Sequence, residues 1–315
     1  MRVVFMGTPD FALPVLEGLL SDGCQVMGVY TRPDQPAGRG RQPAPPPVKT
    51  YALSRGLPVF QPRSLRREEA VQELASLQPE IIVVAAYGRI LPPEALAVPP
   101  LGVLNIHPSL LPKYRGPSPV TTALLEGESV TGISVMLMDE GMDTGSILAQ
   151  RQTSILPHET AGELTHRLFR LGAERLLEVL PEWTAGVMMP VPQDEAMATI
   201  TRLYTKEDGD LDWSLPAVAL ARRLCAFQPW PGCYTRWEGK LLRILEGGAT
   251  DSGGAPTAPP GQVVALGKAI NYPVAVATGK GLLGLRQVQL EGRKAQAVEE
   301  FLRGHPRFTE ARLPS

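Results

Sequence analysis

Three polar side chains, Asn105, His107 and Asp143, stand at positions from which they could form hydrogen bonds to a substrate or exchange protons with it. Asn105 and His107 alternate in the apolar run of residues 102–107, so an extended chain would direct both to the same side. Asp143 follows a second apolar run, residues 134–138, in an acidic turn flanked by glycines. A carboxylate beside an imidazole is suited to acid and base catalysis. We therefore predict that these three residues are catalytic.

Each of these residues also has a structural interpretation. His107 could be a hydrogen-bonded histidine of the core, and Asp143 could stabilise its own turn. A hydrolase that uses Ser109 and His107 is disfavoured, because no G-x-S-x-G sequence surrounds the serine. The triplet Asp-Thr-Gly at residues 143–145 occurs without the second half that an aspartic protease requires.

The first half of the chain alternates apolar runs with amphipathic stretches. Buried strands are predicted at residues 3–6, 25–30, 81–85, 102–107 and 147–155, and helices at residues 9–20, 66–77 and 161–183. Continuous apolar strands between helices are typical of a parallel sheet that is covered on both faces. We therefore predict an α/β fold whose first domain, residues 1–189, is Rossmann-like with a mostly parallel sheet. Ligands of such sheets bind at the carboxyl ends of the strands.

The pattern changes after residue 208. Short strands are predicted at residues 234–237, 241–246, 263–266, 274–278 and 282–290, and helices at residues 216–224 and from residue 295. Short strands separated by turn residues favour a small, open β-barrel of OB-like type over residues 208–315. Residues 190–207 are predicted to be the linker, and residues 247–261, rich in Gly, Pro, Ser and Thr, a loop.

Composition excludes several classes of protein. The 315 residues are 43% hydrophobic and 20% charged with a net charge of −1, which indicates a globular chain and not a disordered or coiled-coil one. We find neither a transmembrane run nor a secretion signal, so we expect a cytoplasmic protein that does not contact a membrane. The three cysteines are widely spaced and fit neither a disulfide framework nor a metal site.

Positive charge is concentrated between residues 31 and 67, which hold eight basic side chains and one acidic one. The Gly/Pro-rich centre of this segment, residues 32–41, is predicted to be an exposed loop whose arginines could bind phosphates. A solvated loop without a ligand is the alternative. A G-x-G-x-x-G match at residues 279–284 is interpreted as a hairpin turn, because no helix follows it.

Six segments taken together resemble the methionyl-tRNA formyltransferase family, and the resemblance covers almost the whole chain. They are residues 6–11, 32–40, 86–91, 105–116, 141–145 and 227–232. The polar trio with its Ser-Leu-Leu-Pro sequence is shared with the wider group of formyltransferases that use 10-formyltetrahydrofolate. It therefore indicates the donor and the reaction, whereas the arginine-rich loop and the Phe-Gln-Pro-Trp-Pro-Gly segment indicate the acceptor. One departure is Arg41-Gln42, where relatives often carry lysines.

The resemblance implies formyl transfer from 10-formyltetrahydrofolate to the amino group of methionine on initiator methionyl-tRNA. It implies a monomer that needs no metal. It also implies that Asn105 donates a hydrogen bond to the oxyanion and that His107, charged or neutral, adds a second donor. Asp143 would relay protons through water and orient His107.

The resemblance also implies two binding surfaces. Folate is expected to lie against Tyr87, Gly88, Arg89, Ile90, Ser109, Leu110, Leu111, Pro112 and Met142. The tRNA is expected to contact Arg39, Arg41 and Lys206. Two alternatives stay open: a folate formyltransferase acting on a nucleotide or an amino sugar, and a non-catalytic RNA-binding module. The basic segment and second domain argue against the first, and the polar trio argues against the second.

Overall fold

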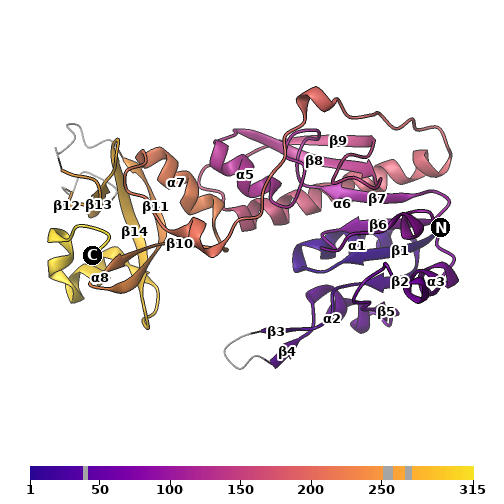
Figure 1. The fold of residues 1–315 in the computed structure, drawn as a ribbon, viewed down its shortest axis with the longest axis horizontal. Helices are drawn as coiled ribbons and strands as arrows, with labels where there is room; N and C mark the ends of the chain where they lie inside the picture. The colour runs from indigo at the N-terminus through magenta and orange to yellow at the C-terminus, as the bar shows by residue number, and fades with distance from the viewer. Residues whose placement is uncertain (38–41, 251–257, 267–271) are drawn as a thin grey trace. The chain divides into compact units, whose positions relative to one another are not determined.

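The computed structural model describes residues 1–37, 42–250, 258–266 and 272–315 (Figure 1). These residues form two compact units. The first unit comprises Met1–Pro119, Ser129–Ile155 and Leu164–Thr201, and the second comprises Val120–Glu128, Leu156–Glu163 and Arg202–Ser315. The domain limits expected from the sequence, residues 1–189 and 208–315 with a linker between them, stay a prediction.

A seven-stranded sheet forms the centre of the first unit, with the strand order β5-β2-β1-β6-β7-β8-β9. The strands are β1 (Arg2–Gly7), β2 (Gln25–Tyr30), β5 (Val59–Phe60), β6 (Ile81–Ala85), β7 (Val103–His107), β8 (Val130–Leu137) and β9 (Ile147–Ser154). The strands from β5 to β7 in this order run parallel, and β8 is antiparallel to both β7 and β9. The predicted mostly parallel, Rossmann-like sheet is confirmed.

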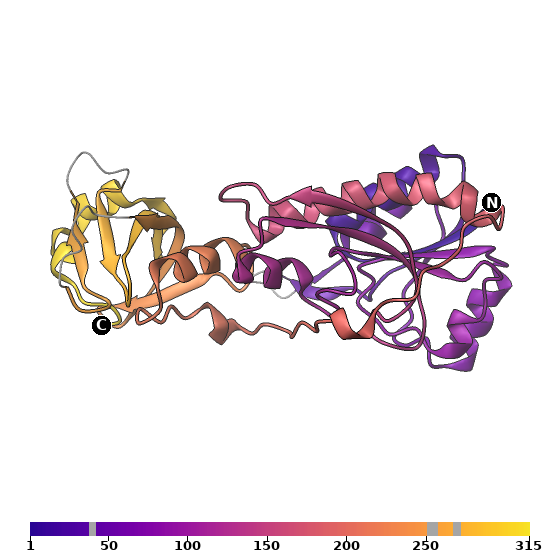
Figure 2. The same cartoon turned by 90° about the horizontal axis from the view of Figure 1, so that it is seen from above.

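One face of this sheet is covered by α1 (Leu13–Ser21) and α6 (Ala161–Thr184), which run together in Figure 2. Glycines allow the close approach: a Cβ on Gly172 of α6 would lie 2.5 Å from the side chain of Ile106 in β7. Similarly, a Cβ on Gly18 of α1 would lie 3.3 Å from Leu177 of α6. Since side chains alternate along a strand, Asn105 and His107 point to the opposite face from Ile106.

That opposite face packs against α3 (Glu68–Ser76) and α4 (Pro93–Leu96). Its buried core joins Ile82 and Val103 of the sheet to Leu74 of α3 and Ala95 of α4. The other helices described before residue 200 are η1 (Asp10–Ala12), α2 (Pro47–Ser54), α5 (Pro119–Glu126) and η2 (Glu195–Met197). Asn105 and His107 therefore lie on the face that α3 and α4 cover.

The basic segment contains a hairpin that the sequence did not reveal. Strands β3 (Gln35–Ala37) and β4 (Gln42–Ala44) pair antiparallel. A loop was predicted over residues 32–41, so the prediction is wrong for residues 35–37. Two identical Gln-Pro-Ala triplets pair with each other, and Pro36 stands opposite Pro43. A proline cannot donate a backbone hydrogen bond, but both strands of a two-stranded ribbon are edge strands, where a proline is tolerated if its nitrogen faces away from the partner strand. Residues 38–41 lie outside the described residues.

The second unit is built on a six-stranded antiparallel sheet of order β10-β11-β14-β13-β12, with β15 beside β14. Its strands are β10 (Cys233–Trp237), β11 (Lys240–Thr250), β12 (Val263–Ala265), β13 (Val274–Ala277), β14 (Leu282–Leu290) and β15 (Gln296–Ala297). Its helices are η3 (Lys206–Gly209), α7 (Ala217–Ala226), α8 (Val298–Gly304) and η4 (Pro306–Glu310). The predicted small, open β-barrel is confirmed as a curled antiparallel sheet (Figure 1).

Glycines explain one difference between prediction and structure in this sheet. Strand β11 continues to Thr250, whereas a loop was predicted from residue 247. Gly247 and Gly248 pair with β14, where a Cβ on Gly247 would lie 2.4 Å from the carbonyl of Gly284. These glycines are thus close-packing positions of a strand. The G-x-G-x-x-G match forms the hairpin between β13 and β14, with Gly281 at a φ of 83°, as predicted.

Two findings bear on the chain as a whole. None of the helices in the described part of the chain is both long and apolar enough to cross a membrane. Cys24, Cys225 and Cys233 are present as free thiols.

Candidate active site

His107 and Asp143 come together although the topology separates them. His107, the last residue of β7, pairs with Ser134 of β8, whereas Leu137 at the end of β8 pairs with Leu104 near the start of β7. The turn after β8 must therefore fold back over the sheet to reach His107. It does so, and His107 Nδ1 lies 3.6 Å from Asp143 Oδ2.

Two backbone groups of the segment after β7 hold this pair. His107 Nε2 lies 2.9 Å from the carbonyl oxygen of Tyr114, and Asp143 Oδ2 accepts a 2.8 Å hydrogen bond from the amide of Gly116. Because a carbonyl only accepts, Nε2 of His107 carries a proton and donates it to this bond. Nδ1, the nitrogen facing Asp143, is then the one that gains or loses a proton. The side chains are 5% and 18% exposed, so the pair is largely shielded from water.

Asp143 has an unusual backbone conformation, with a φ of 57°. This left-handed conformation costs a non-glycine residue about 1–3 kcal/mol and persists only where the surroundings enforce it. Asp139 supplies part of that enforcement, since its Oδ1 accepts hydrogen bonds from the Gly141 amide at 3.1 Å and the Thr144 hydroxyl at 2.7 Å. The turn therefore presents the Asp143 carboxylate in a fixed direction.

Asn105 lies two residues before His107 and on the same side of β7. It is half-buried, and among the described residues its side-chain amide has no hydrogen-bond partner. A polar group in this position that is not paired within the protein is available to a ligand. Together, Asn105, His107 and Asp143 can supply an N–H donor, a protonatable nitrogen and a carboxylate.

The loop after β7 is held rigidly by two side chains from β8 and β9. The Ser134 hydroxyl donates to the carbonyl of Ser109 and accepts from the amide of Leu111, and Gln150 Nε2 donates to both Ser134 and the Leu111 carbonyl. Ser109 is fully buried and its hydroxyl donates to the Lys113 carbonyl at 2.6 Å. Leu111 is buried too, while Leu110 and Pro112 are partly exposed. Contact of this loop with folate stays a prediction.

The other residues predicted to bind folate differ widely in exposure. Tyr87 is buried, which raises the pKa of its hydroxyl to about 12, and Arg89 is half-buried and donates to the Arg63 carbonyl. Gly88, Ile90 and Met142 are exposed. Their role in binding stays a prediction.

A hollow of about 700 Å³ is bounded by α3 and by the segment before α4, and Asn105, His107 and Asp143 are not among its lining residues. It is lined by Ile90, by Val71 and Gln72 of α3, and by Glu140 of the turn that holds Asp143. Cavities of this size accept ligands as large as a cofactor.

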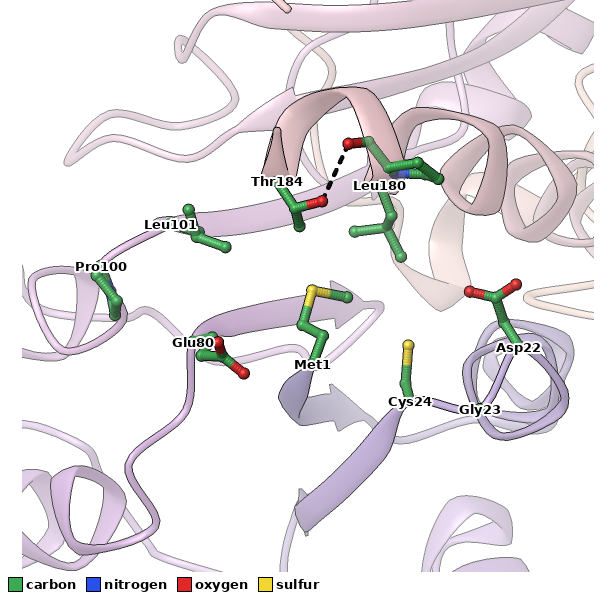
Figure 3. A pocket seen from close by; sticks show the side chains of 10 residues that line it. Met1, Asp22, Gly23, Cys24, Glu80, Pro100, Leu101, Leu180 and Thr184 are labelled. Atoms are coloured by element: carbon green, nitrogen blue, oxygen red, sulfur yellow. Dashed lines mark hydrogen bonds between the residues drawn. The ribbon is translucent and has the colours of Figure 1, made fainter. Parts of the chain in front are cut away.

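A second hollow of about 580 Å³ lies at the amino ends of the parallel strands (Figure 3). Its lining includes Met1, Cys24 and Glu80, each of which directly precedes a strand of the parallel sheet. Parallel sheets bind their ligands at the carboxyl ends of the strands. We therefore place the candidate active site at His107 and not at this hollow.

Of the three residues predicted to contact tRNA, Lys206 lies in the described part of the chain. Lys206 is exposed and begins η3 in the second unit. Arg39 and Arg41 lie outside the described residues. Within the described ranges, no three His, Cys, Asp or Glu side chains are grouped as metal ligands.

Sequence reasoning missed several residues that hold the site together. Ser134 and Gln150 fix the loop after β7, and Arg115, Gln193 and Glu195 join the segment of Gly116 to the turn of Asp143. Arg115 lies within a segment that carries the family resemblance, which is a usable signal. Gln193 lies in a Pro-rich stretch that was interpreted as a linker, and nothing in its local pattern distinguishes it.

An open α/β sheet with a shielded His–Asp pair beside an unpaired amide defines a Rossmann-like enzyme with acid–base groups. A family model described as formyl transferase matches residues 1–180, and one described as formyl transferase, C-terminal domain, matches residues 204–306. A methionyl-tRNA formyltransferase of Chloroflexus aurantiacus is 48% identical over 304 residues, 96% of this chain and 97% of the relative. One of Marinobacter nauticus is 44% identical over 96% of each chain. The chain belongs to the methionyl-tRNA formyltransferase family.

Solved structures agree with this fold. HypX from Aquifex aeolicus in complex with tetrahydrofolic acid matches with a TM-score of 0.63 and 18% identity, over 98% of this chain and 47% of HypX. An N-formyltransferase from Helicobacter canadensis, in complex with folinic acid and dTDP-3-aminofucose, matches with a TM-score of 0.63 and 14% identity. This match covers 94% of this chain and all of that one. At such low identity these likenesses concern the fold alone.

The close packing of the Asp143 turn provides a test of the site. A Cβ on Gly145 would lie 1.8 Å from the carbonyl oxygen of Leu137, so Gly145→Ala must displace the turn. Because a displacement of about 1 Å at a catalytic group costs on the order of 10²-fold in rate, we expect kcat to fall by about that factor. Gly304→Ala is the matched control, since a Cβ there meets no atom within 4 Å. Steady-state formylation assays of both variants measure the effect, and an unchanged kcat for Gly145→Ala would remove Asp143 from the mechanism.

Proposed function

We propose that this enzyme transfers the formyl group of 10-formyltetrahydrofolate to the α-amino group of methionine on initiator methionyl-tRNA. The product is N-formylmethionyl-tRNA, used in translation initiation. The observation that carries the proposal is the shielded His107–Asp143 pair beside the unpaired Asn105 amide, in a chain nearly half identical to methionyl-tRNA formyltransferases over its length.

Formyl transfer makes three chemical demands. The amine attacks the formyl carbon, negative charge develops on the formyl oxygen, and the folate nitrogen takes up a proton as it leaves. The Asn105 amide can donate a hydrogen bond to the oxygen. The neutral form of His107 has its one proton committed to Tyr114, so it can provide a second donor only when Nδ1 is protonated. Asp143 stabilises that charge and relays the proton lost by the amine, through water, to the leaving folate nitrogen.

The donor site is proposed on the face of the sheet that carries the trio. The hollow of about 700 Å³ reaches from Ile90 to Glu140, three residues before Asp143. Apolar Ile90 and Met142, which are 73% and 53% exposed, would be covered by the folate. HypX, which has the same fold, was solved with tetrahydrofolic acid, in keeping with this ligand class.

The clustered positive charge of the chain and its second domain support tRNA as the acceptor. The basic segment of residues 31–67 and the exposed Lys206 suit a polyanion, and the second domain matches the formyl transferase C-terminal model. A nucleotide or amino sugar acceptor needs none of these. A non-catalytic RNA-binding module would have no use for the His107–Asp143 pair.

Two further properties follow from the proposal. We also propose that the enzyme acts as a monomer. Because the product serves translation initiation, we place the enzyme in the cytoplasm. None of the three chemical demands calls for a metal ion.

The function is tested by incubating the purified protein with 10-formyltetrahydrofolate and methionyl-tRNA. Formylation of the initiator species, measured by acid gel electrophoresis of the tRNA, is the expected result. Parallel incubations with an amino sugar nucleotide and with glycinamide ribonucleotide test the small-amine alternative. Formylation of either small amine in preference to the tRNA would contradict the proposal.

Loss of any member of the trio should lower turnover. Removing one oxyanion donor typically costs about 10²–10³-fold in kcat, and we expect this for Asn105→Ala, with clear losses for His107→Ala and Asp143→Ala. Affinity for tRNA should stay nearly unchanged, because none of the three is proposed to contact phosphates. The exposed His158 provides a control, His158→Ala, that should keep full activity. Single-turnover rates measure the effect, and a trio variant at the wild-type rate would lose its assigned role.

Electrostatic contact with tRNA should depend on salt. Each lost phosphate contact lowers the slope of log affinity against log salt concentration by about 0.7–0.9. We therefore expect Lys206→Ala and Arg39→Ala to raise KM for methionyl-tRNA and to reduce this slope, with KM for the folate unchanged. Binding titrations at several salt concentrations measure both quantities, and equal losses for tRNA and folate would place these residues elsewhere.

A further inference from the structure

We propose that Gln193 is a positioning residue of the formyl transfer site and that residues 191–201, here called the strap, hold the two catalytic segments together. The inference deepens the proposed function and rests on it, because the residues it positions are those assigned to formyl transfer. All of the residues involved belong to the first unit.

The Gln193 amide binds the turn that presents Asp143. Its Nε2 donates to the carbonyl of Asp143 at 2.8 Å and to the carbonyl of Gly145 at 2.7 Å. Both bonds act on the turn in which Asp143 adopts a φ of 57°. A left-handed aspartate needs such external restraint, so these two bonds help to fix the direction of its carboxylate.

The other end of the same amide binds the segment after β7. Gln193 Oε1 accepts a 3.0 Å hydrogen bond from Nε of Arg115, whose guanidinium also forms two bonds of 2.9 and 2.7 Å with Glu195. Arg115 is 4% exposed, and the bonds from Glu195 raise its pKa and lower that of Glu195. Arg115 stands between Tyr114, whose carbonyl pairs with His107, and Gly116, whose amide pairs with Asp143. The Gln193 side chain thus links the Asp143 turn, through Arg115, to the segment whose backbone binds both His107 and Asp143.

The strap itself is anchored by its backbone. Val191 and Ile147 exchange two 2.8 Å hydrogen bonds, the Arg115 amide donates to the Thr199 carbonyl, and the Thr201 amide donates to the Arg115 carbonyl. These bonds do not involve the Gln193 side chain. A substitution of Gln193 therefore leaves the strap in place and removes only side-chain bonds, those to the Asp143 turn and to Arg115.

Two substitutions separate the two ends of the amide. Gln193→Ala removes every bond of the side chain. Gln193→Glu keeps an acceptor for Arg115 but turns a carboxylate oxygen toward the carbonyls of Asp143 and Gly145, which it cannot bind. Gln262 supplies a matched control in the second unit, because its Nε2 also donates to backbone carbonyls, those of Val263, Glu310 and Ala311.

The experiment combines kinetics with amide exchange. We expect Gln193→Ala and Gln193→Glu to lower kcat for formylation by about tenfold or more, with KM for both substrates within about twofold of wild type. We also expect faster hydrogen exchange at the Gly116 amide, which donates to Asp143. Gln262→Ala should leave kcat and the Gly116 exchange rate unchanged.

Two outcomes would overturn the inference. One is a wild-type kcat in Gln193→Glu. The other is a loss of kcat that accompanies a loss of thermal stability while Gly116 exchange stays at the wild-type rate, which would make Gln193 a residue of general stability. The wild-type protein in the same assay tests the proposed function separately, and the exchange measurement needs no substrate.

Discussion

The hydrogen bond between His107 Nε2 and the Tyr114 carbonyl determines what the candidate site can do. It commits one ring nitrogen to the backbone and leaves Nδ1 facing Asp143, so proton exchange is confined to one atom. That atom lies beside a carboxylate whose other interaction, with the Gly116 amide, comes from the same segment as Tyr114. The imidazole and the carboxylate are therefore oriented by one stretch of backbone, and their relative position depends on where that stretch lies.

Sheet topology explains why so many side chains are needed to hold Asp143 beside His107. Strand β8 runs antiparallel to β7, so the turn that follows β8 starts near the amino end of β7. It must fold back across the sheet to reach His107 at the carboxyl end. The return is achieved by close packing at Gly145 and by the bonds of Asp139 to Gly141 and Thr144. A turn that is fixed both by its own side chains and by distant groups such as the Gly116 amide can hold a strained aspartate, because its surroundings remove the alternatives.

The sequence revealed the parts of this arrangement that follow from local pattern. Asn105 and His107 are visible because polar residues interrupt an apolar strand, and the sheet is visible because its strands are continuous apolar runs. The facing prolines of β3 and β4, the strand glycines of β11 and the bonds of Gln193 were not visible. Each depends on a partner in another segment, and irregular, proline-rich or glycine-rich stretches carry no periodicity that would indicate the pairing.

The protonation state of the His107 ring tests the central claim most directly. Imidazole nitrogen NMR of the selectively labelled protein, recorded at a pH where the ring is neutral, distinguishes a protonated nitrogen from an unprotonated one. The account predicts that Nε2 of His107 carries the proton and that Nδ1 does not. A neutral ring with its proton on Nδ1 would contradict it, because the bond to Tyr114 would then be absent and Asp143 would bind the imidazole in a different way.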